Sequence, residues 1–183
     1  FGKRYCHANL NSTGKYLPQE FVSPEYLQYF GKLGWFSLDT MFSTFGVTGI
    51  YEAVKYMGYD ILDDEGTEFA MDMMAYIKDK CKFYRKKYNC TFNAEEIPGE
   101  QACVTLLQKD RVMYEGYNFD CELYSNQYIP LINDADMITR IDLSGRFMKM
   151  ISGGGIVHAN CEAPIDTDGK MYEIMKFAAK SGV

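Results

Sequence analysis

The chain has 183 residues, of which 47% are hydrophobic, 15% aromatic and 24% charged, and its net charge is -6. This length is typical of one domain with a sizeable core, and no apolar run approaches the roughly 20 residues of a membrane span, so we expect a soluble, cytoplasmic protein. The acidic balance argues against nucleic-acid binding, although a single nucleotide can still bind at a helix N-terminus or at backbone amides.

The first 35 residues form a less regular lead-in. Residues 1–23 are polar and show no sustained period, which is typical of a loop or a broken strand. The sequence SPE (23–25) then provides an N-cap, a proline and an acidic residue in that order. We therefore expect a short helix that ends near Gly31 or Gly34.

A strand over 36–45, a glycine turn and a helix over 50–57 are predicted next, and Gly58 is a natural residue to end this helix. The hydrophobic residues at helical spacing should face inward: Val47, Ile50, Val54 and Met57. Gly46 and Gly49 could cradle a phosphate. A Gly-x-x-Gly turn without a following Lys-Ser/Thr is only a weak phosphate-binding signal, however.

The most regular helix is predicted over 66–88. Its apolar face should consist of hydrophobic residues that recur every three or four positions: Phe69, Met73, Ile77, Cys81, Tyr84 and Tyr88. Acidic residues precede this helix and basic residues crowd its end, which complements the helix dipole. The basic cluster therefore has a structural explanation, and no nucleic-acid contact is inferred from it.

The segment FNAEEIPGEQACV (92–104) predicts a strand, a tight turn at Pro98-Gly99 and a helix that runs to about Lys109. Glu100 would lie in the first helical turn, at the carboxyl end of a strand, where α/β sheets hold their ligands. A carboxylate at that place can act as an acid or a base. The alternative is that Glu100 only satisfies amides of the first helical turn.

Two more strands are predicted in the second half of the chain. In the strand over 123–130, three polar residues mark either a sheet edge or a surface that faces a ligand: Ser125, Asn126 and Gln127. Three glycines at 153–155 precede a strand over 156–159, and such a run usually marks close approach by another chain segment or by a ligand. His158 in that strand is interpreted as a core residue.

Helices are expected within 134–151 and over 167–179, the second with four residues inward: Met171, Ile174, Met175 and Ala178. Strands then alternate with helices at least four times, which predicts an α/β fold with a partly parallel sheet. The six cysteines include no C-x-x-C and the two histidines are far apart, so no metal site is predicted within the chain. The chain has no initial methionine and ends directly after a predicted helix, so we expect a piece of a larger polypeptide.

Three motifs follow one another along the chain: FNAEEIPGEQAC (92–103), YSNQY (124–128) and GGGIVH (153–158). Their order and spacing resemble the catalytic domain of the class III anaerobic ribonucleoside-triphosphate reductases. GVTGIYEA (46–53) also looks like the segment that these enzymes place before their Pro-x-Glu helix. The resemblance extends from about residue 36 to the end of the chain, and residues 1–35 match less clearly.

The resemblance implies that residues 1–183 are part of a catalytic domain, the second half of a ten-stranded glycyl-radical-type α/β barrel. In such enzymes a glycyl radical generates a cysteine thiyl radical, which removes a hydrogen from the ribose of a ribonucleoside triphosphate, and the deoxyribonucleotide product serves DNA replication. The resemblance also implies a structural zinc, ATP or dNTP effectors, a radical-SAM activase and a homodimer for the parent protein. The radical cysteine and glycine would lie outside this chain, so the chain alone should bind no cofactor and be inactive.

By motif matching, the resemblance implies that Glu100 is the catalytic glutamate of the Pro-x-Glu motif and that Asn126 binds substrate as the asparagine of Tyr-[Ser/Thr]-Asn. Both should converge on an enclosed cavity, where Glu100 would hydrogen-bond the ribose hydroxyls. Gly46 and Gly49 are expected to border the substrate phosphates. Two alternatives stay open: another glycyl-radical enzyme of the pyruvate formate-lyase type, and a non-catalytic nucleotide-binding module that uses the glycine turns.

Overall fold

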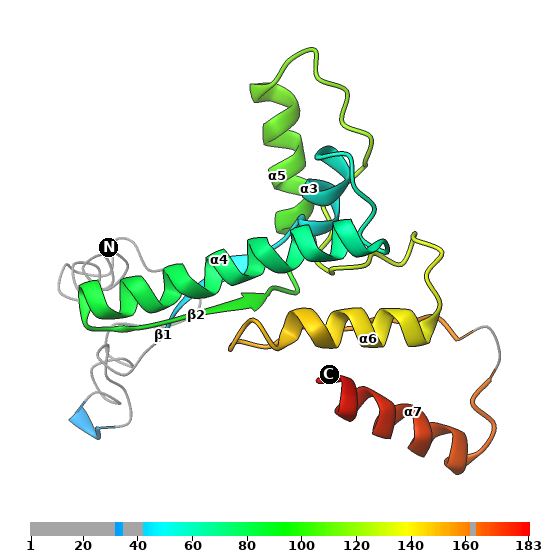
Figure 1. Ribbon diagram of the computed structural model, residues 1–183. Coiled ribbons are helices and arrows are strands. Elements are labelled where there is room, and N and C mark those ends of the chain that lie inside the picture. Colours follow the sequence, from blue (N-terminus) through cyan, green and yellow to red (C-terminus); the bar gives the residue numbers. More distant parts are fainter. Residues whose placement is uncertain (1–31, 35–41, 162–163) are drawn as a thin grey trace. The chain divides into compact units, whose positions relative to one another are not determined.

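The computed structural model describes residues 32–34, 42–161 and 164–183 (Figure 1). The chain divides into two compact units, one made of Phe1–Thr44 and Lys80–Asn93 and the other of Phe45–Asp79 and Ala94–Val183. The lead-in helix and the start of the first predicted strand lie outside the described residues. None of the described helices combines the length and the apolar character that crossing a membrane requires.

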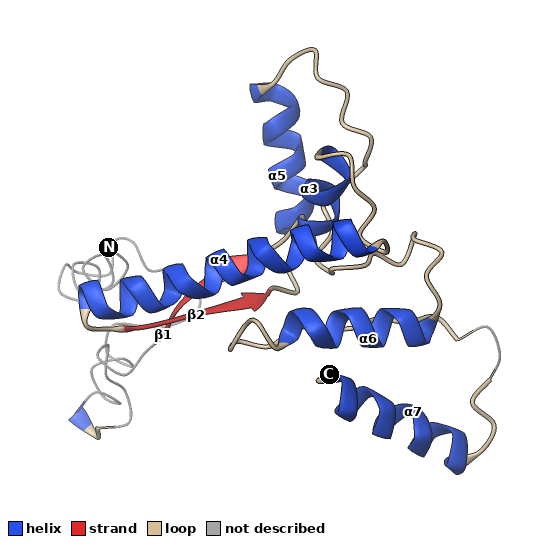
Figure 2. Ribbon diagram, in the orientation of Figure 1, coloured by secondary structure: helices blue, strands red, loops and turns tan. Residues whose placement is uncertain are grey.

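The described residues form these elements in chain order: β1 (Phe42–Val47), α3 (Ile50–Tyr56), α4 (Asp64–Tyr88), β2 (Thr91–Glu96), α5 (Glu100–Met113), α6 (Met137–Met148) and α7 (Asp168–Ser181). The connections between α5 and α6 and between α6 and α7 are long, and their described residues form neither helix nor strand (Figure 2). Helices and strands therefore mix as the α/β prediction requires. The described residues nevertheless contain two strands, fewer than the predicted four or more.

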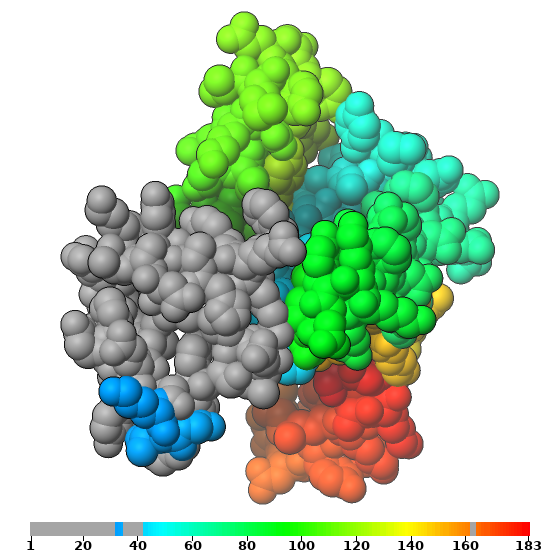
Figure 3. Space-filling view, turned by 90° about the vertical axis from the view of Figure 1, so that its left-hand side faces the viewer, coloured from blue at the N-terminus to red at the C-terminus, as the bar shows by residue number. Residues whose placement is uncertain are grey.

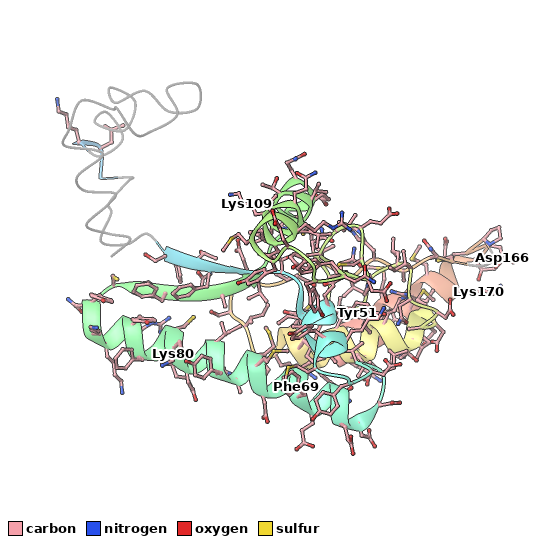
Figure 4. The ribbon with its side chains drawn as sticks, turned by 90° about the horizontal axis from the view of Figure 1, so that it is seen from above. Tyr51, Phe69, Lys80, Lys109, Asp166 and Lys170 are labelled. Carbon is pink, nitrogen blue, oxygen red and sulfur yellow. The ribbon has the colours of Figure 1, made fainter. Side chains whose placement is uncertain are left out.

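β1 and β2 pair in one sheet and run in the same direction (Figure 4). Alternate residues of β2 are buried: Phe92, Ala94 and Glu96. This is the period-two pattern of a strand with one face toward a core, and it confirms the predicted strand in this stretch. The side chains of Thr44 and Asn93 join the two strands by a hydrogen bond of 2.6 Å.

Helix α3 buries Val54 completely and ends at Tyr56, and the predicted glycine follows at Gly58, whose φ is +88° and whose N–H bonds to the carbonyl of Lys55 at 3.0 Å. The inward position predicted for Met57 is wrong, since Met57 is 55% exposed. The physical reason is that α3 ends at Tyr56, so Met57 no longer continues the buried helical face.

Helix α4 begins and ends with the predicted charges, acidic in its first turn and basic in its last. Its buried face agrees with the predicted one only in part: Cys81 is buried as predicted, but the helix also buries Thr67, Ala70 and Met74, and Tyr88 is 43% exposed. Small residues explain the difference. They let the helix approach the preceding turn, where the Thr67 hydroxyl donates to the carbonyl of Ile61 at 2.8 Å.

Helices α6 and α7 contact each other through a glycine. A Cβ atom added at Gly145 would lie 2.4 Å from the carbonyl oxygen of Ser181, so only glycine permits this approach. The contact lies at the C-terminal end of α7, and the predicted inward positions of Met171 and Met175 are wrong because both are exposed. Figure 3 shows α7, in red and orange, at the surface of the molecule.

The chain between α5 and α6 folds around the buried guanidinium of Arg140. This group donates hydrogen bonds to the backbone carbonyls of four residues: Ile129, Pro130, Asn133 and Ala135. A buried cation is stable only when its donors are satisfied, and here backbone oxygens satisfy them. The side chain of Asp136 caps α6 immediately afterwards by accepting from the amides of Ile138 and Thr139.

Candidate functional site

The predicted strand, turn and helix around Pro98-Gly99 are present. β2 ends at Glu96, the Gly99 N–H bonds to the carbonyl of Ile97 at 2.8 Å, and α5 begins at Glu100. No side chain caps this helix at Gly99. The turn therefore presents the Glu100 carboxylate at the carboxyl end of a strand, as the sequence predicted.

Glu100 and Asn126 lie next to each other, although 26 residues separate them along the chain. The Asn126 Nδ2 donates to Glu100 Oε1 at 3.2 Å. Glu100 is exposed and Asn126 is half-buried, so in the described part of the chain the pair lies at the surface and is not enclosed as expected.

The residue after Asn126, Gln127, forms a second polar pair. Gln127 Nε2 and His158 Nδ1 are 2.7 Å apart. His158 is exposed, so its interpretation as a core residue is wrong. The segment 125–128 therefore presents one amide side chain to Glu100 and the next one to His158.

The predicted strand over 123–130 is not formed, because the backbone of this segment bonds mainly to side chains. The Ser125 carbonyl accepts from the Gly49 N–H at 2.8 Å and from the Thr48 hydroxyl at 2.9 Å. The Ser125 N–H and hydroxyl both donate to the carboxylate of Glu52, at 3.0 and 2.6 Å. The polar residues in this stretch thus mark neither a sheet edge nor a strand.

Sequence reasoning missed Glu96, which is 4% exposed. One carboxylate oxygen accepts from the Tyr128 N–H at 2.8 Å and the other accepts from the Ile156 N–H at 2.9 Å. A signal was available, because the period-two pattern of β2 puts Glu96 on the buried face with Phe92 and Ala94. A buried carboxylate at the end of a strand needs donors, and here two other segments supply them.

The glycine run at 153–155 is explained by the close approach of another chain segment, which was one of the two predicted explanations. A Cβ at Gly153 would lie 2.5 Å from Glu95 Cβ, and one at Gly155 would lie 2.6 Å from Glu96 Oε2. The Gly153 N–H bonds to the Ala94 carbonyl at 2.8 Å, and the Glu96 N–H bonds to the Gly154 carbonyl at 3.1 Å. The predicted strand over 156–159 is wrong, since this pairing with β2 involves the glycines themselves.

Gly46 and Gly49 both have structural roles in this chain. A Cβ at Gly46 would lie 2.8 Å from a methyl group of Ile97, and Gly49 adopts a φ of +76° while its N–H bonds to Ser125. Glycine is required at the second position because other residues rarely adopt that φ. The predicted place of both glycines beside the substrate phosphates stays a prediction.

A pocket of about 770 Å³ lies between α3, α5 and the loop that follows α5. Its lining includes Glu52 and several aromatic residues but neither Glu100 nor Asn126. Its charged groups have partners: Lys55 pairs with Asp120 at 2.7 Å, and the Tyr124 hydroxyl donates to Asp110 at 2.6 Å. Within the described ranges, no three His, Cys, Asp or Glu side chains are placed to hold a metal ion.

Burial raises the pKa of the Glu96 carboxyl from 4.5 to about 7, although the two backbone donors act to lower it. The folded protein therefore holds this proton more tightly than the unfolded chain. The contribution of the group to the free energy of unfolding is fully present below pH 4.5 and is lost as the pH rises through about 7. By linkage this loss amounts to about 3 kcal/mol.

We therefore expect the full-length protein to lose stability between about pH 5 and pH 8 relative to its Glu96→Gln variant, which has no proton to release at this position. Urea unfolding at a series of pH values measures the two slopes. Identical slopes for the two proteins would contradict the raised pKa.

Comparison with known proteins gives a consistent result. The family model of anaerobic ribonucleoside-triphosphate reductase matches residues 15–183. Among solved structures, the chain is similar to the anaerobic ribonucleotide reductase from Thermotoga maritima with MES in the active site, at 32% identity and a TM-score of 0.74, over 87% of this chain and 29% of that chain. The same enzyme in complex with dATP and CTP matches at 32% identity and a TM-score of 0.73, over 87% of this chain and 28% of that one.

A comparison with curated proteins gave no match. The chain spans less than a third of the length of the solved structures cited above. The family model nevertheless covers most of the chain, including β2, α5 and the segments that carry Asn126 and His158. The chain therefore belongs to the anaerobic ribonucleoside-triphosphate reductase family.

Proposed function

We propose that the full-length protein reduces ribonucleoside triphosphates to deoxyribonucleotides and that this chain forms one wall of its substrate pocket. The observation that carries this proposal is the contact of 3.2 Å between Asn126 Nδ2 and Glu100 Oε1, which joins the Pro-x-Glu and Tyr-Ser-Asn motifs in space. The family match favours this function over a pyruvate formate-lyase type of enzyme and over a non-catalytic nucleotide-binding module. The similar T. maritima enzyme in complex with dATP and CTP also supports it.

Each residue of the pair has a distinct role in this proposal. Glu100 hydrogen-bonds the ribose hydroxyls and exchanges a proton with them, which requires an accessible carboxylate such as the exposed one at the start of α5. Asn126 orients the Glu100 carboxylate through its amide and contacts the substrate from the opposite segment. The position of Glu100 after β2 agrees with the general placement of ligands in α/β folds.

The remaining parts of the proposal concern the parent protein. The chain is part of the second half of a ten-stranded α/β barrel, and its two parallel strands joined through α3 and α4 are compatible with such a barrel. A glycyl radical outside this chain supplies the hydrogen abstraction. For the parent protein, the proposal also includes a structural zinc, ATP or dNTP effectors, a radical-SAM activase, a homodimer and a cytoplasmic location. In the part of the chain that the structure describes, no three His, Cys, Asp or Glu side chains are placed to hold the zinc.

The test uses the full-length protein, activated without oxygen by its radical-SAM activase and incubated with CTP and a reductant. Chromatography should show formation of the deoxycytidine nucleotide, and omission of the activase should abolish it. A protein that carries the glycyl radical but converts no ribonucleotide would contradict the proposal. Cleavage of pyruvate by the same preparation would favour the pyruvate formate-lyase alternative.

A further inference from the structure

We propose that Glu52 and Glu96 are positioning residues that hold the segment Ser125–Tyr128 at its two ends and thereby fix the directions of the Asn126 and Gln127 side chains. This inference rests on the proposed function, because it explains how Asn126 is kept beside Glu100. It assigns a role to two carboxylates that do not touch the substrate.

The two carboxylates bind opposite ends of the segment. At the first end, Glu52 accepts from the N–H and the hydroxyl of Ser125 at 3.0 and 2.6 Å. At the other end, Glu96 accepts from the N–H of Tyr128 at 2.8 Å. Asn126 and Gln127 are the two residues between these anchors, and each directs its side chain to a partner, Glu100 or His158.

Few other bonds hold this segment. Its backbone forms no strand, and in the part of the chain that the structure describes its only backbone–backbone bond joins the Ser125 carbonyl to Gly49. A segment in a sheet has a ladder of bonds to fix it, whereas here the side chains of Glu52 and Glu96 replace that ladder. Glu96 also binds the Ile156 N–H at 2.9 Å and so links the segment to the strand end and to the chain that leads to His158.

The two anchors differ in chemistry, and this makes the proposal testable. Both groups that donate to Glu96 are N–H groups, so a glutamine could accept only one bond and would turn its NH₂ toward the other donor. Glu52 faces one N–H and one hydroxyl, and a hydroxyl can also accept. A glutamine at position 52 therefore keeps both bonds. The same change from glutamate to glutamine should therefore loosen the segment when made at position 96 and leave it held when made at position 52.

The first measurement is hydrogen exchange in the full-length protein at pH 8, followed in a peptide that covers residues 124–130. Glu96→Gln should speed exchange in this peptide about tenfold, because one buried donor loses its acceptor. Glu52→Gln should leave it unchanged, whereas Glu52→Ala, which removes both acceptors, should speed it. Glu95→Gln is the matched control, since it makes the same change at the adjacent, half-buried position of β2.

The second measurement is the rate of deoxynucleotide formation. Glu96→Gln should lower this rate on the order of 10- to 100-fold through misplacement of Asn126. Added to Asn126→Ala, it should cost little more than Asn126→Ala alone, because both changes remove the same positioned amide. A role in stability alone would instead give additive losses.

Independent, additive losses of rate, or unchanged exchange in Glu96→Gln, would overturn the proposal. If Glu96→Gln fails to fold, Glu52→Ala provides the same two measurements from the other end of the segment. A wild-type protein without reductase activity would contradict the proposed function, and the exchange measurement alone would then decide whether the two carboxylates hold the segment.

Discussion

Replacement of Glu100 by glutamine in the full-length protein is expected to lower the rate of deoxynucleotide formation by about 10²- to 10⁴-fold. Glutamine has the shape of glutamate and its amide oxygen can still accept from Asn126 Nδ2, now at 3.2 Å from Oε1, but it cannot take up or release a proton. The glycyl radical should form normally, because its formation requires no proton exchange at Glu100 in the proposed mechanism. Single-turnover assays with CTP, combined with the electron paramagnetic resonance signal, measure both quantities.

A matched control separates catalysis from a helix-dipole effect. Glu65 also lies in the first turn of a helix, α4, as Glu100 does in α5. If first-turn stabilisation were the only role of Glu100, then Glu100→Gln and Glu65→Gln would both lower the stability slightly and leave turnover intact. Undiminished turnover in Glu100→Gln would remove this residue from the active site.

Among glycine-to-alanine changes at the described positions, Gly66→Ala should be the most destabilising. A Cβ atom at this position would lie 1.7 Å from the carbonyl oxygen of Asp60 and 2.4 Å from its carbonyl carbon, and neither backbone atom can move independently of the turn. The start of α4 must therefore shift away from the turn, which also strains the Thr67 bond to Ile61. We expect a loss of about 3 kcal/mol or more, at the upper end of the range for overpacking a core.

Gly169 provides the comparison, because it also lies in the first turn of a helix, α7, but has no atom within 4 Å of an added Cβ. Gly169→Ala should stabilise the protein by about 0.4–1 kcal/mol through the reduced freedom of the unfolded chain. Thermal unfolding of the full-length variants, followed by circular dichroism, measures both shifts. A Gly66→Ala protein as stable as the wild type would contradict the close approach of α4 to the turn.

The sequence predicted the elements with strong local signals. β2 was recognisable from its period of two, α4 from its length and charge distribution, and the turn before Glu100 from Pro98-Gly99. These signals depend only on residues that are close together in the sequence, so the predictions made from them do not require knowledge of the tertiary structure. Close approach by another chain segment was one of the two explanations predicted for the glycine run, the other being a ligand, because glycine has no side chain to prevent such an approach.

The segment 123–130 could not be predicted, because its conformation depends on residues far away in the chain. Its composition favours a strand, but Glu52 and Glu96 take up the amides that a neighbouring strand would otherwise bind. The prediction of the buried face of α4 was incomplete for a related reason. The large hydrophobic residues suggested one face, whereas the small residues Gly66 and Ala70 define where the helix contacts its neighbours. Periodicity detects apolar bulk and does not detect which surfaces fit together.

The contact of Glu100 with Asn126 followed from the resemblance rather than from any local pattern. Neither residue carries a signal that identifies its partner, and only the order of the motifs suggested that the two converge. Glu96 was within reach of sequence reasoning, because an acidic residue on the buried face of a strand always requires an explanation.

The cage of carbonyls around Arg140 has a consequence for the loop that forms it. Four main-chain oxygens point inward to one guanidinium, and the side chain of Ile132 at the tip of the same loop is 87% exposed. The loop thus owes its shape to a residue in the following helix together with its own Asn133, whose side chain accepts from the Ala135 N–H at 2.8 Å. Changes at its tip leave the backbone path intact, whereas a lysine in place of Arg140 lacks the planar fork of donors needed to reach all four oxygens.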